Sequence, residues 1–482
     1  MQRKFILNLI LIILVNLMIK PMYIFGIERN IQNIVGAADY GLFYSLFNLS
    51  FILSIILDPG ITNYNNRHIA QNEHLLSTSF SNIISLKIFL TFIYIVVITI
   101  YALVLTFNTE EWYLISLLII GQILNSFTLY NRSNLAGMQL FKTDTFISIL
   151  DKLLMIIVCA PIIYFGLGTA NLNIATFITL QTFSFLGAAI ISFFYVKKHT
   201  KFFKIHLNWA NSISILKESY PFAILALLML IYTKADTVLL KEIHKNGNKE
   251  VGVYAAAYRL IDALNMIAVL FSGLLYPIFA RMIKEKQNIE GLLKTSFSLL
   301  VLPSAVFALF SFFYAENIMQ LLYINNVAEA AKIFKILIIG FVFICNGYIY
   351  GTLLTANGNI RLLNKIAFVG VLINILLNLI FIPFYGALGS AYVSVCTFFI
   401  VTSTQLYFSH RKFDINVQIS YIIRAILSLI AIVLICYFSM KLNFNWLSKY
   451  AFGIILSIII LIISRLLPIK QLTLLMKQDK IV

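Results

Sequence analysis

The chain is poor in charged residues, and this shortage excludes most classes of protein. Only 11% of its 482 residues are charged, whereas 61% are hydrophobic, and the mean hydropathy is +0.92. A soluble domain is about half apolar and about a quarter charged. A disordered chain needs more charge and fewer apolar residues than this. The composition therefore indicates an integral membrane protein.

Cysteines are also few, and they are badly spaced for a disulfide framework or a zinc site. No C-x-x-C pair occurs, and each cysteine is inside an apolar run, which favours small buried hydrophobes. The four are Cys159, Cys345, Cys396 and Cys436. A Walker A pattern is absent too, so ATP hydrolysis by this chain is not expected. The sequence predicts no cofactor beyond a coupling ion.

Apolar stretches close to the ~20 residues that cross a bilayer recur along the whole chain. They are continuous rather than alternating, which favours helices over an outer-membrane barrel. The predicted fold class is all-α, a polytopic membrane protein of fourteen transmembrane helices. The predicted spans are 5–27, 38–58, 82–107, 112–132, 145–166, 174–196, 220–240, 252–280, 297–315, 333–355, 362–383, 387–409, 419–440 and 449–467. The first is read as an uncleaved helix because no small-residue cleavage site follows Arg3-Lys4.

Basic residues outnumber acidic ones, with 36 Lys and Arg against 19 Asp and Glu and a net charge of +17. On a soluble chain this excess suggests nucleic acid, but on so apolar a chain it marks the cytoplasmic loops. With the N-terminus inside, most basic residues outside the spans fall on the cytoplasmic side. Both termini are therefore predicted to be cytoplasmic, and nucleic acid is not an expected partner. The loop Lys241–Glu250 fits this rule poorly.

Two motifs of the first half recur in the second half. Asp39–Phe43 matches Glu250–Tyr254, and Phe165–Ala170 matches Tyr385–Ala391 with one insertion. An even number of predicted spans separates each pair, which indicates a parallel duplication. Transporters with two such halves bind substrate between them and alternate access by rocking. The predicted organisation is an N-terminal six-helix bundle (1–200), a basic cytoplasmic linker (201–219), a C-terminal six-helix bundle (220–412), and two additional transmembrane helices with a short tail (413–482).

Charged residues inside spans cost about 2.5 kcal/mol or more each, so they are candidates for function. Counted at ~1.5 Å per residue, Lys20, Lys234 and Arg259 share a depth near the outer ends of their helices. Cations at one depth suit a phosphate or pyrophosphate, so these three are predicted to bind substrate. Asp236 and Asp262 would hold the cations when the site is empty or bind a coupling proton or Na⁺. A structural Arg259–Asp262 pair and an outward-reaching Lys20 are the alternatives.

A second group of charges lies near the predicted inner ends of the spans. It contains Asp58, Lys87, Arg132, Asp151 and Lys152. Lys87, Arg132, Asp151 and Lys152 are secondary candidates for a substrate site. Several of them can instead reach the cytoplasmic surface, which is the structural alternative.

Segments in both halves carry a family resemblance. They are Ile19–Pro21, Gly36–Phe43, Asp58–Ile61, Asn66–Ala70, Val251–Arg259, Tyr276–Pro277 and Tyr385–Ala391. Together with the number and order of spans, they resemble the polysaccharide transport family. These are Wzx-type flippases of lipid-linked oligosaccharides, within the superfamily that includes drug/cation antiporters and the lipid II flippase.

The resemblance implies two bundles around a central cavity in the bacterial cytoplasmic (inner) membrane. An undecaprenyl-pyrophosphate-linked oligosaccharide would move outward through it for O-antigen, capsule or exopolysaccharide synthesis, with the lipid tail left in the bilayer. In the lipid II flippase, basic residues of the first and eighth helices line the cavity, and Lys20 and Arg259 occupy comparable places. Polysaccharide polymerase and chain-length proteins are implied partners. H⁺ and Na⁺ both stay open as the coupling ion.

Other classes of function fit the sequence less well. A polytopic glycosyl-transferring enzyme usually needs a sizeable outer loop, and none of the predicted outer loops is long. A drug/cation antiporter of the same superfamily predicts a cavity dominated by carboxylates, whereas the outer group has more cations than carboxylates. A purely structural membrane protein would not need intramembrane charges. The sequence therefore favours a flippase that is not an enzyme.

Overall fold

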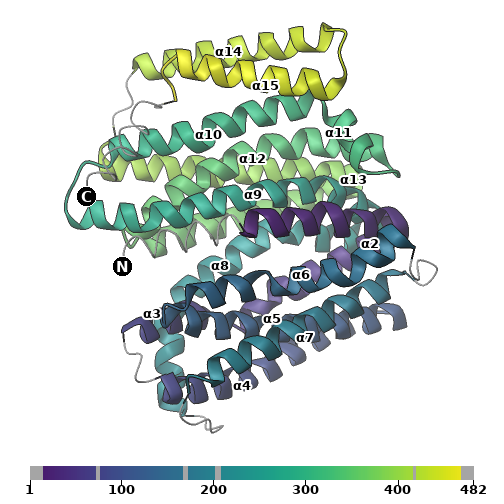
Figure 1. Ribbon diagram of the computed structural model, residues 1–482, viewed down its shortest axis with the longest axis vertical. Helices are drawn as coiled ribbons and strands as arrows, with labels where there is room; N and C mark the ends of the chain where they lie inside the picture. The colour runs from purple at the N-terminus through teal and green to yellow at the C-terminus, as the bar shows by residue number, and fades with distance from the viewer. Residues whose placement is uncertain (1–14, 72–75, 167–171, 201–207, 416–418, 468–482) are drawn as a thin grey trace. The chain divides into compact units, whose positions relative to one another are not determined.

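A computed structural model describes residues 15–71, 76–166, 172–200, 208–415 and 419–467. Within these ranges the chain forms helices and turns with no strand, which confirms the all-α prediction (Figure 1). Four predicted features lie partly outside the described residues. They are the start of the first span (5–14), the linker (201–207), the motif residues 167–170 and the C-terminal tail (468–482).

The helices follow one another with short connections. Their bounds are η1 (Ile24–Glu28), α2 (Arg29–Leu53), η2 (Ser54–Ile56), α3 (Ile61–Gln71), α4 (Leu76–Val104), α5 (Thr109–Gly137), α6 (Phe141–Phe165), α7 (Ile174–Lys197), α8 (Trp209–Ile243), α9 (Gly247–Lys284), α10 (Glu290–Phe313), α11 (Ala315–Leu322), α12 (Val327–Ala356), α13 (Ile360–Phe413), α14 (Ile419–Lys441) and α15 (Trp446–Ile463). A further helical segment, 15–23, precedes η1.

Two helical stretches are too long for one crossing. Val15–Ile56 has 42 residues and α13 has 54, or roughly 60 and 80 Å against a bilayer core of about 30 Å. Each is interrupted by a glycine at positive φ, Gly36 (φ 86°) and Gly386 (φ 51°), a backbone conformation that other residues adopt only with strain. Each break lies between two predicted spans. Within the described ranges 11 helices are long and apolar enough to cross a membrane, and the total of fourteen stays a prediction.

Many large apolar side chains of these helices face outward, as a lipid environment requires. Phe165 and Phe384, for example, are each 80% exposed. An exposed apolar surface this extensive is typical of a membrane protein. Cys159, Cys345 and Cys436 are buried, as expected, but Cys396 is exposed. The protein is thus a multi-pass membrane protein.

The chain divides into two compact units. Unit 1 comprises residues 1–256 and 375–387, and unit 2 comprises 257–374 and 388–482. In unit 1, α5 packs on α3 and α7, and α2 packs on α8. In unit 2, α10 packs on α12, and it packs on α14 and α15 over a core that includes Phe310 and Leu461. The predicted domain boundaries rest on the sequence repeat, whereas the two units are defined by packing. The predicted boundaries therefore stay a prediction.

The two repeated glycine motifs meet inside unit 1, where α2 crosses the start of α9. A Cβ on Gly41 would lie 1.8 Å from the carbonyl oxygen of Asn248, and one on Gly252 would lie 1.9 Å from that of Ala37. Side chains other than hydrogen are therefore excluded on both sides. The Gln32 amide donates a hydrogen bond to the Gly252 carbonyl, 2.8 Å away. We call this contact the glycine crossing.

Polar contacts surround the glycine crossing. The Glu250 carboxylate accepts a hydrogen bond from the Ala387 backbone N–H at 2.8 Å, directly after the break at Gly386. Lys241 of α8 forms an ion pair with Glu111 of α5 at 2.7 Å. Together these contacts join α2, α5, α8, α9 and the middle of α13 at one end of unit 1.

Candidate substrate site

Five charged side chains form a cluster in unit 1, which we call the cationic cluster: Lys20, Arg132, Asp144, Asp151 and Lys152. Arg132 of α5 donates from Nε to Asp144 of α6 at 2.7 Å, and Lys152 pairs with Asp151 at 2.9 Å. Lys20, in the segment 15–23, is half-buried and close enough to Arg132, Asp151 and Lys152 to interact electrostatically. Three helical segments therefore supply these charges.

Aromatic and amide side chains hold this corner of unit 1 together. The Lys152 ammonium lies 4.8 Å from the ring centre of Tyr23 and 5.3 Å from that of Phe185. Such cation–π contacts stabilise a lysine that is partly removed from water. The Tyr23 hydroxyl accepts a hydrogen bond from Gln181 at 3.3 Å. The rings of Tyr23 and Phe185 therefore hold Lys152 in position.

The cationic cluster carries three cations and two carboxylates, so one positive charge is in excess. Its paired side chains are 12–27% exposed. A phosphate oxygen can replace a carboxylate as the acceptor for Arg and Lys, with charge-assisted bonds of similar geometry. The arrangement therefore suits a phosphate or pyrophosphate group.

The cationic cluster differs in membership from the groups predicted by depth. Depth counting puts Lys20 in the outer group and Arg132, Asp151 and Lys152 in the inner one, yet Lys20 is close enough to each of the other three to interact electrostatically. Asp144 is absent from both predicted groups, since it lies between the predicted spans ending at 132 and beginning at 145. Arg132 and Asp144 lie on either side of a tight turn between two predicted spans. That spacing is the sequence signal from which their pairing could have been predicted.

The other predicted site residues of the outer group belong to α8 and α9. Asp236 of α8 is 1% exposed and accepts hydrogen bonds from the Tyr254 hydroxyl at 3.0 Å and the Asn378 amide at 2.8 Å, both within unit 1. Lys234, two residues before Asp236, is half-buried. Arg259 and Asp262 are half-buried residues of unit 2. That the outer cations form one layer stays a prediction.

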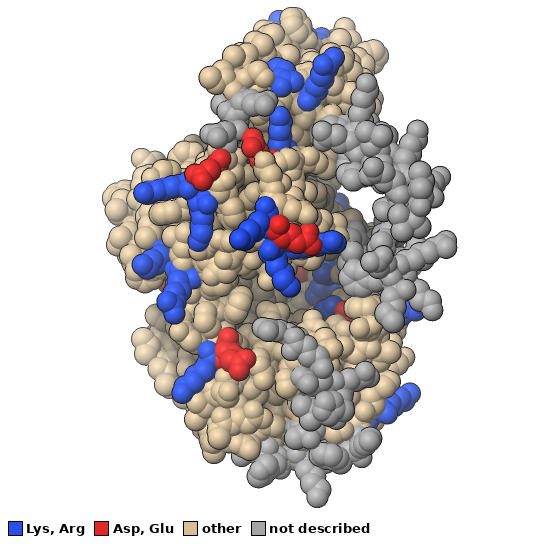
Figure 2. All heavy atoms as spheres, turned by 90° about the vertical axis from the view of Figure 1, so that its left-hand side faces the viewer, with Lys and Arg blue, Asp and Glu red and all other residues tan. Residues whose placement is uncertain are grey.

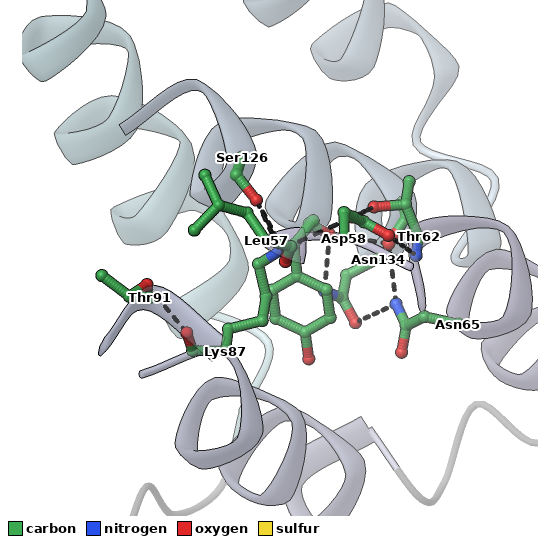
Figure 3. A network of polar contacts seen from close by, with 10 residues as sticks. Leu57, Asp58, Thr62, Asn65, Lys87, Thr91, Ser126 and Asn134 are labelled. Atoms are coloured by element: carbon green, nitrogen blue, oxygen red, sulfur yellow. Dashed lines mark hydrogen bonds and ion pairs between the residues drawn. The ribbon is translucent and has the colours of Figure 1, made fainter. Parts of the chain in front are cut away.

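Lys87 has a different environment, shown in Figure 3. It is 1% exposed, and its ammonium donates to the Leu57 carbonyl at 2.9 Å and the Ser126 hydroxyl at 2.7 Å, with the Asp58 carboxylate 3.4 Å away. Asp58 in turn accepts from the backbone N–H and the hydroxyl of Thr62 in the first turn of α3. Lys87 thus bonds a carbonyl at the end of one helix and pairs with the carboxylate that caps the start of the next.

We expect Lys87→Met to lower the free energy of unfolding by about 3 kcal/mol, because it leaves Asp58 and the Leu57 carbonyl without their buried partner. Thermal unfolding of the purified protein in detergent measures this. Lys197→Met, at an exposed lysine at the end of α7, is the control, with an expected change below about 0.5 kcal/mol. Equal midpoints for the two variants would contradict a structural role for Lys87.

The helical architecture is that of a polytopic membrane protein. Residues 5–283 match the family model described as polysaccharide biosynthesis protein, and residues 221–380 match the MatE model. The first match covers more than half of the chain, so this protein belongs to the polysaccharide biosynthesis protein family. The capsular polysaccharide biosynthesis protein CapF of Staphylococcus aureus is 25% identical over 251 residues, which are 50% of this chain and 61% of CapF. The chain thus aligns with less than two thirds of that relative.

Solved structures share the fold. The lipid II flippase MurJ, in an inward closed conformation, matches with a TM-score of 0.72 and 16% identity over 96% of this chain and 100% of MurJ. An inward-facing MATE transporter of the MOP superfamily matches at 0.61 and 14%, over 84% and 98%. A MOP superfamily transporter from Pyrococcus furiosus matches at 0.60 and 16%, over 85% and 95%. This chain thus shares the fold of these three proteins.

Proposed function

We propose that this protein is a flippase that carries an undecaprenyl-pyrophosphate-linked oligosaccharide from the cytoplasmic to the outer leaflet, for surface polysaccharide synthesis. The observation that carries the proposal is the cationic cluster, which offers Lys20, Arg132 and Lys152 to a pyrophosphate. Family membership supports the same class of substrate. Translocation breaks no covalent bond, so the protein is not an enzyme in this proposal.

The orientation follows from the distribution of basic residues. On the face shown in Figure 2, lysine and arginine side chains are more numerous than acidic ones. Basic residues concentrate on the cytoplasmic side of membrane proteins. In our proposal this face is cytoplasmic, both termini are inside, and the protein resides in the bacterial inner membrane.

Each charged candidate has a role in this proposal. Arg132 and Lys152 exchange their carboxylate partners for the pyrophosphate oxygens when substrate enters. Lys234 and Arg259 supply further positive charge during passage. Asp236, buried between a tyrosine hydroxyl and an amide, is the candidate for a coupling proton or Na⁺, and Asp262 is the second.

A drug/cation antiporter is the second candidate, favoured by the match of residues 221–380 to the MatE model. A cationic drug requires a carboxylate that can receive it. In the cationic cluster both carboxylates are engaged by Arg132 or Lys152 and positive charge is in excess. That charge balance favours an anionic substrate.

Deletion of the gene distinguishes the flippase proposal from the antiporter alternative. The flippase proposal expects the oligosaccharide-lipid to accumulate on the cytoplasmic leaflet and surface polysaccharide to fall, with drug sensitivity unchanged. Leaflet location is measured by the reactivity of the glycan toward a membrane-impermeant reagent, in inverted against right-side-out vesicles. Unchanged surface polysaccharide in a strain without a redundant transporter would refute the proposal, and increased drug sensitivity alone would favour the antiporter.

A further inference from the structure

The turn between α8 and α9 forms a wall of a pocket of about 570 Å³ in unit 1. Ala38 of α2 and Glu111 of α5 also line the pocket, and the remaining lining residues belong to the stretch 241–249. This stretch is the basic loop that the predicted topology puts on the outer side, where lysine is uncommon. Its basic residues therefore need an explanation other than orientation.

Gly247 is what lets the turn close on itself. A Cβ at this position would lie 2.2 Å from the carbonyl oxygen of Lys241. Only glycine allows the start of α9 to fold back on the end of α8. The fold-back brings Lys245 and Lys249 to the same pocket as Lys241.

The charges around the pocket are unbalanced. Lys241 is held by Glu111 at 2.7 Å and Glu242 at 2.8 Å, so Glu111, the carboxylate in the lining, is already engaged. Lys245 and Lys249 are exposed and add two positive charges.

Two further polar side chains lie beside the lysines. His244 accepts a hydrogen bond at Nδ1 from the backbone N–H of Asn246, 3.2 Å away. The nearby Glu250 carboxylate is bonded to the backbone N–H of Ala387. The residues that line the pocket thus include three lysines and one carboxylate, so the lining is net positive, while Glu242 and Glu250 are not part of the lining.

We propose that this pocket binds a sugar that carries an oxyanion, either a carboxylate or a phosphate. Its volume is in the range of small-molecule sites, about 300–1,000 Å³, and exceeds what a bare anion needs. Lysine ammonium groups supply charge-assisted bonds to the oxyanion. The lining residues Asn246 and Asn248 offer amide groups of the kind that bond sugar hydroxyls.

Because separate segments of the chain line the pocket, binding has a structural consequence. Ala38, Glu111 and the α8–α9 turn belong to segments that are far apart in the sequence, and Ala38 is next to the glycine crossing. An occupant that touches all three segments stabilises their packed arrangement, since a ligand favours the state that it binds. This inference goes beyond the proposed function, and its test requires no transport.

The first test uses the unaltered full-length chain in lipid nanodiscs. Lysines are acetylated with a membrane-impermeant ester, and the rate at each lysine is followed by mass spectrometry with glucuronate, glucose 6-phosphate or glucose present. At an anionic sugar concentration ten times its Kd, we expect labelling of Lys245 and Lys249 to slow by about 11-fold. Lys332, an exposed lysine of unit 2, serves as the internal reference and should not change.

The second test measures affinity by ligand-observed saturation-transfer NMR. The double variant Lys245→Gln, Lys249→Gln should bind the protecting sugar about tenfold more weakly, and Lys332→Gln should bind it as the unaltered protein does. The anionic sugar that protects the two lysines from acetylation identifies the oxyanion, which is a carboxylate for glucuronate and a phosphate for glucose 6-phosphate. Protection by glucose equal to that by the anionic sugars, no protection by either anionic sugar, or full affinity in the double variant would each overturn the proposal.

Discussion

Replacing Gly252 with alanine is expected to open the glycine crossing and to reduce export strongly. The new Cβ would lie 1.9 Å from the carbonyl oxygen of Ala37, where an ordinary contact needs about 3.4 Å or more. The obstacle is backbone, so α2 and α9 must move apart. Overpacking of this kind costs about 1–3 kcal/mol, enough to shift a conformational equilibrium by roughly 5- to 150-fold.

The opening can be measured directly. Val251 is fully buried beside the crossing, so a cysteine there should react with a membrane-impermeant maleimide only when the crossing opens. The exposed Cys396 is changed to serine in every variant to remove background labelling. We expect Gly252→Ala to raise the labelling rate of Val251→Cys by about tenfold or more, within that 5- to 150-fold range.

Gly273→Ala is the matched control. Gly273 is in the same helix, α9, and nothing lies within 4 Å of the place its Cβ would occupy. In the Gly273→Ala variant, Val251→Cys should react with the maleimide at the same rate as in the chain without an alanine substitution. The Gly273→Ala variant should also export normally. Equal labelling in the two alanine variants would mean that the crossing does not control access.

Much of this fold follows from hydrophobic runs that are visible in the sequence. Continuous apolar stretches set the helices, and the breaks at Gly36 and Gly386 lie between predicted spans because only glycine adopts those dihedral angles without strain. The repeat is visible as similarity between two motifs. Their direct contact through Gly41 and Gly252 is not, because similarity shows that two segments are equivalent and says nothing about whether they touch.

The candidate site is less accessible to sequence reasoning. Counting residues along a span estimates the depth of a Cα atom, but it leaves open the rotation of the helix and the direction of a long side chain. Depth alone therefore separates Lys20 from Arg132 and Lys152, although their side chains interact. Lys87 shows the converse case, since a charge near the predicted inner end of a helix proves to be fully buried among helix ends.

Neutralising the cationic cluster is expected to abolish export while leaving the fold intact. Each charge-assisted bond to a phosphate oxygen contributes about 1.5–3 kcal/mol, which corresponds to roughly 10- to 150-fold in affinity. The variant Lys20→Gln, Lys152→Gln removes two of the three cations and should reduce export by at least about 100-fold. Export is measured as the rate at which the lipid-linked glycan reaches the outer leaflet in proteoliposomes.

Two matched variants separate the charge of the cationic cluster from its packing. Lys152→Arg keeps the positive charge beside Tyr23 and Asp151, and it should restore most of the export lost in Lys152→Gln, because a guanidinium also pairs with a phosphate and stacks on an aromatic ring. Arg281→Gln removes a cation whose side chain is 79% exposed, and it should have no effect beyond the loss of a surface pair with Glu285.

If export survives in Lys20→Gln, Lys152→Gln at the level of Arg281→Gln, the pyrophosphate does not bind at the cationic cluster. Loss of export in Lys152→Gln that Lys152→Arg restores would instead show that the charge itself is required, because a defect of packing alone would not be repaired by the bulkier guanidinium.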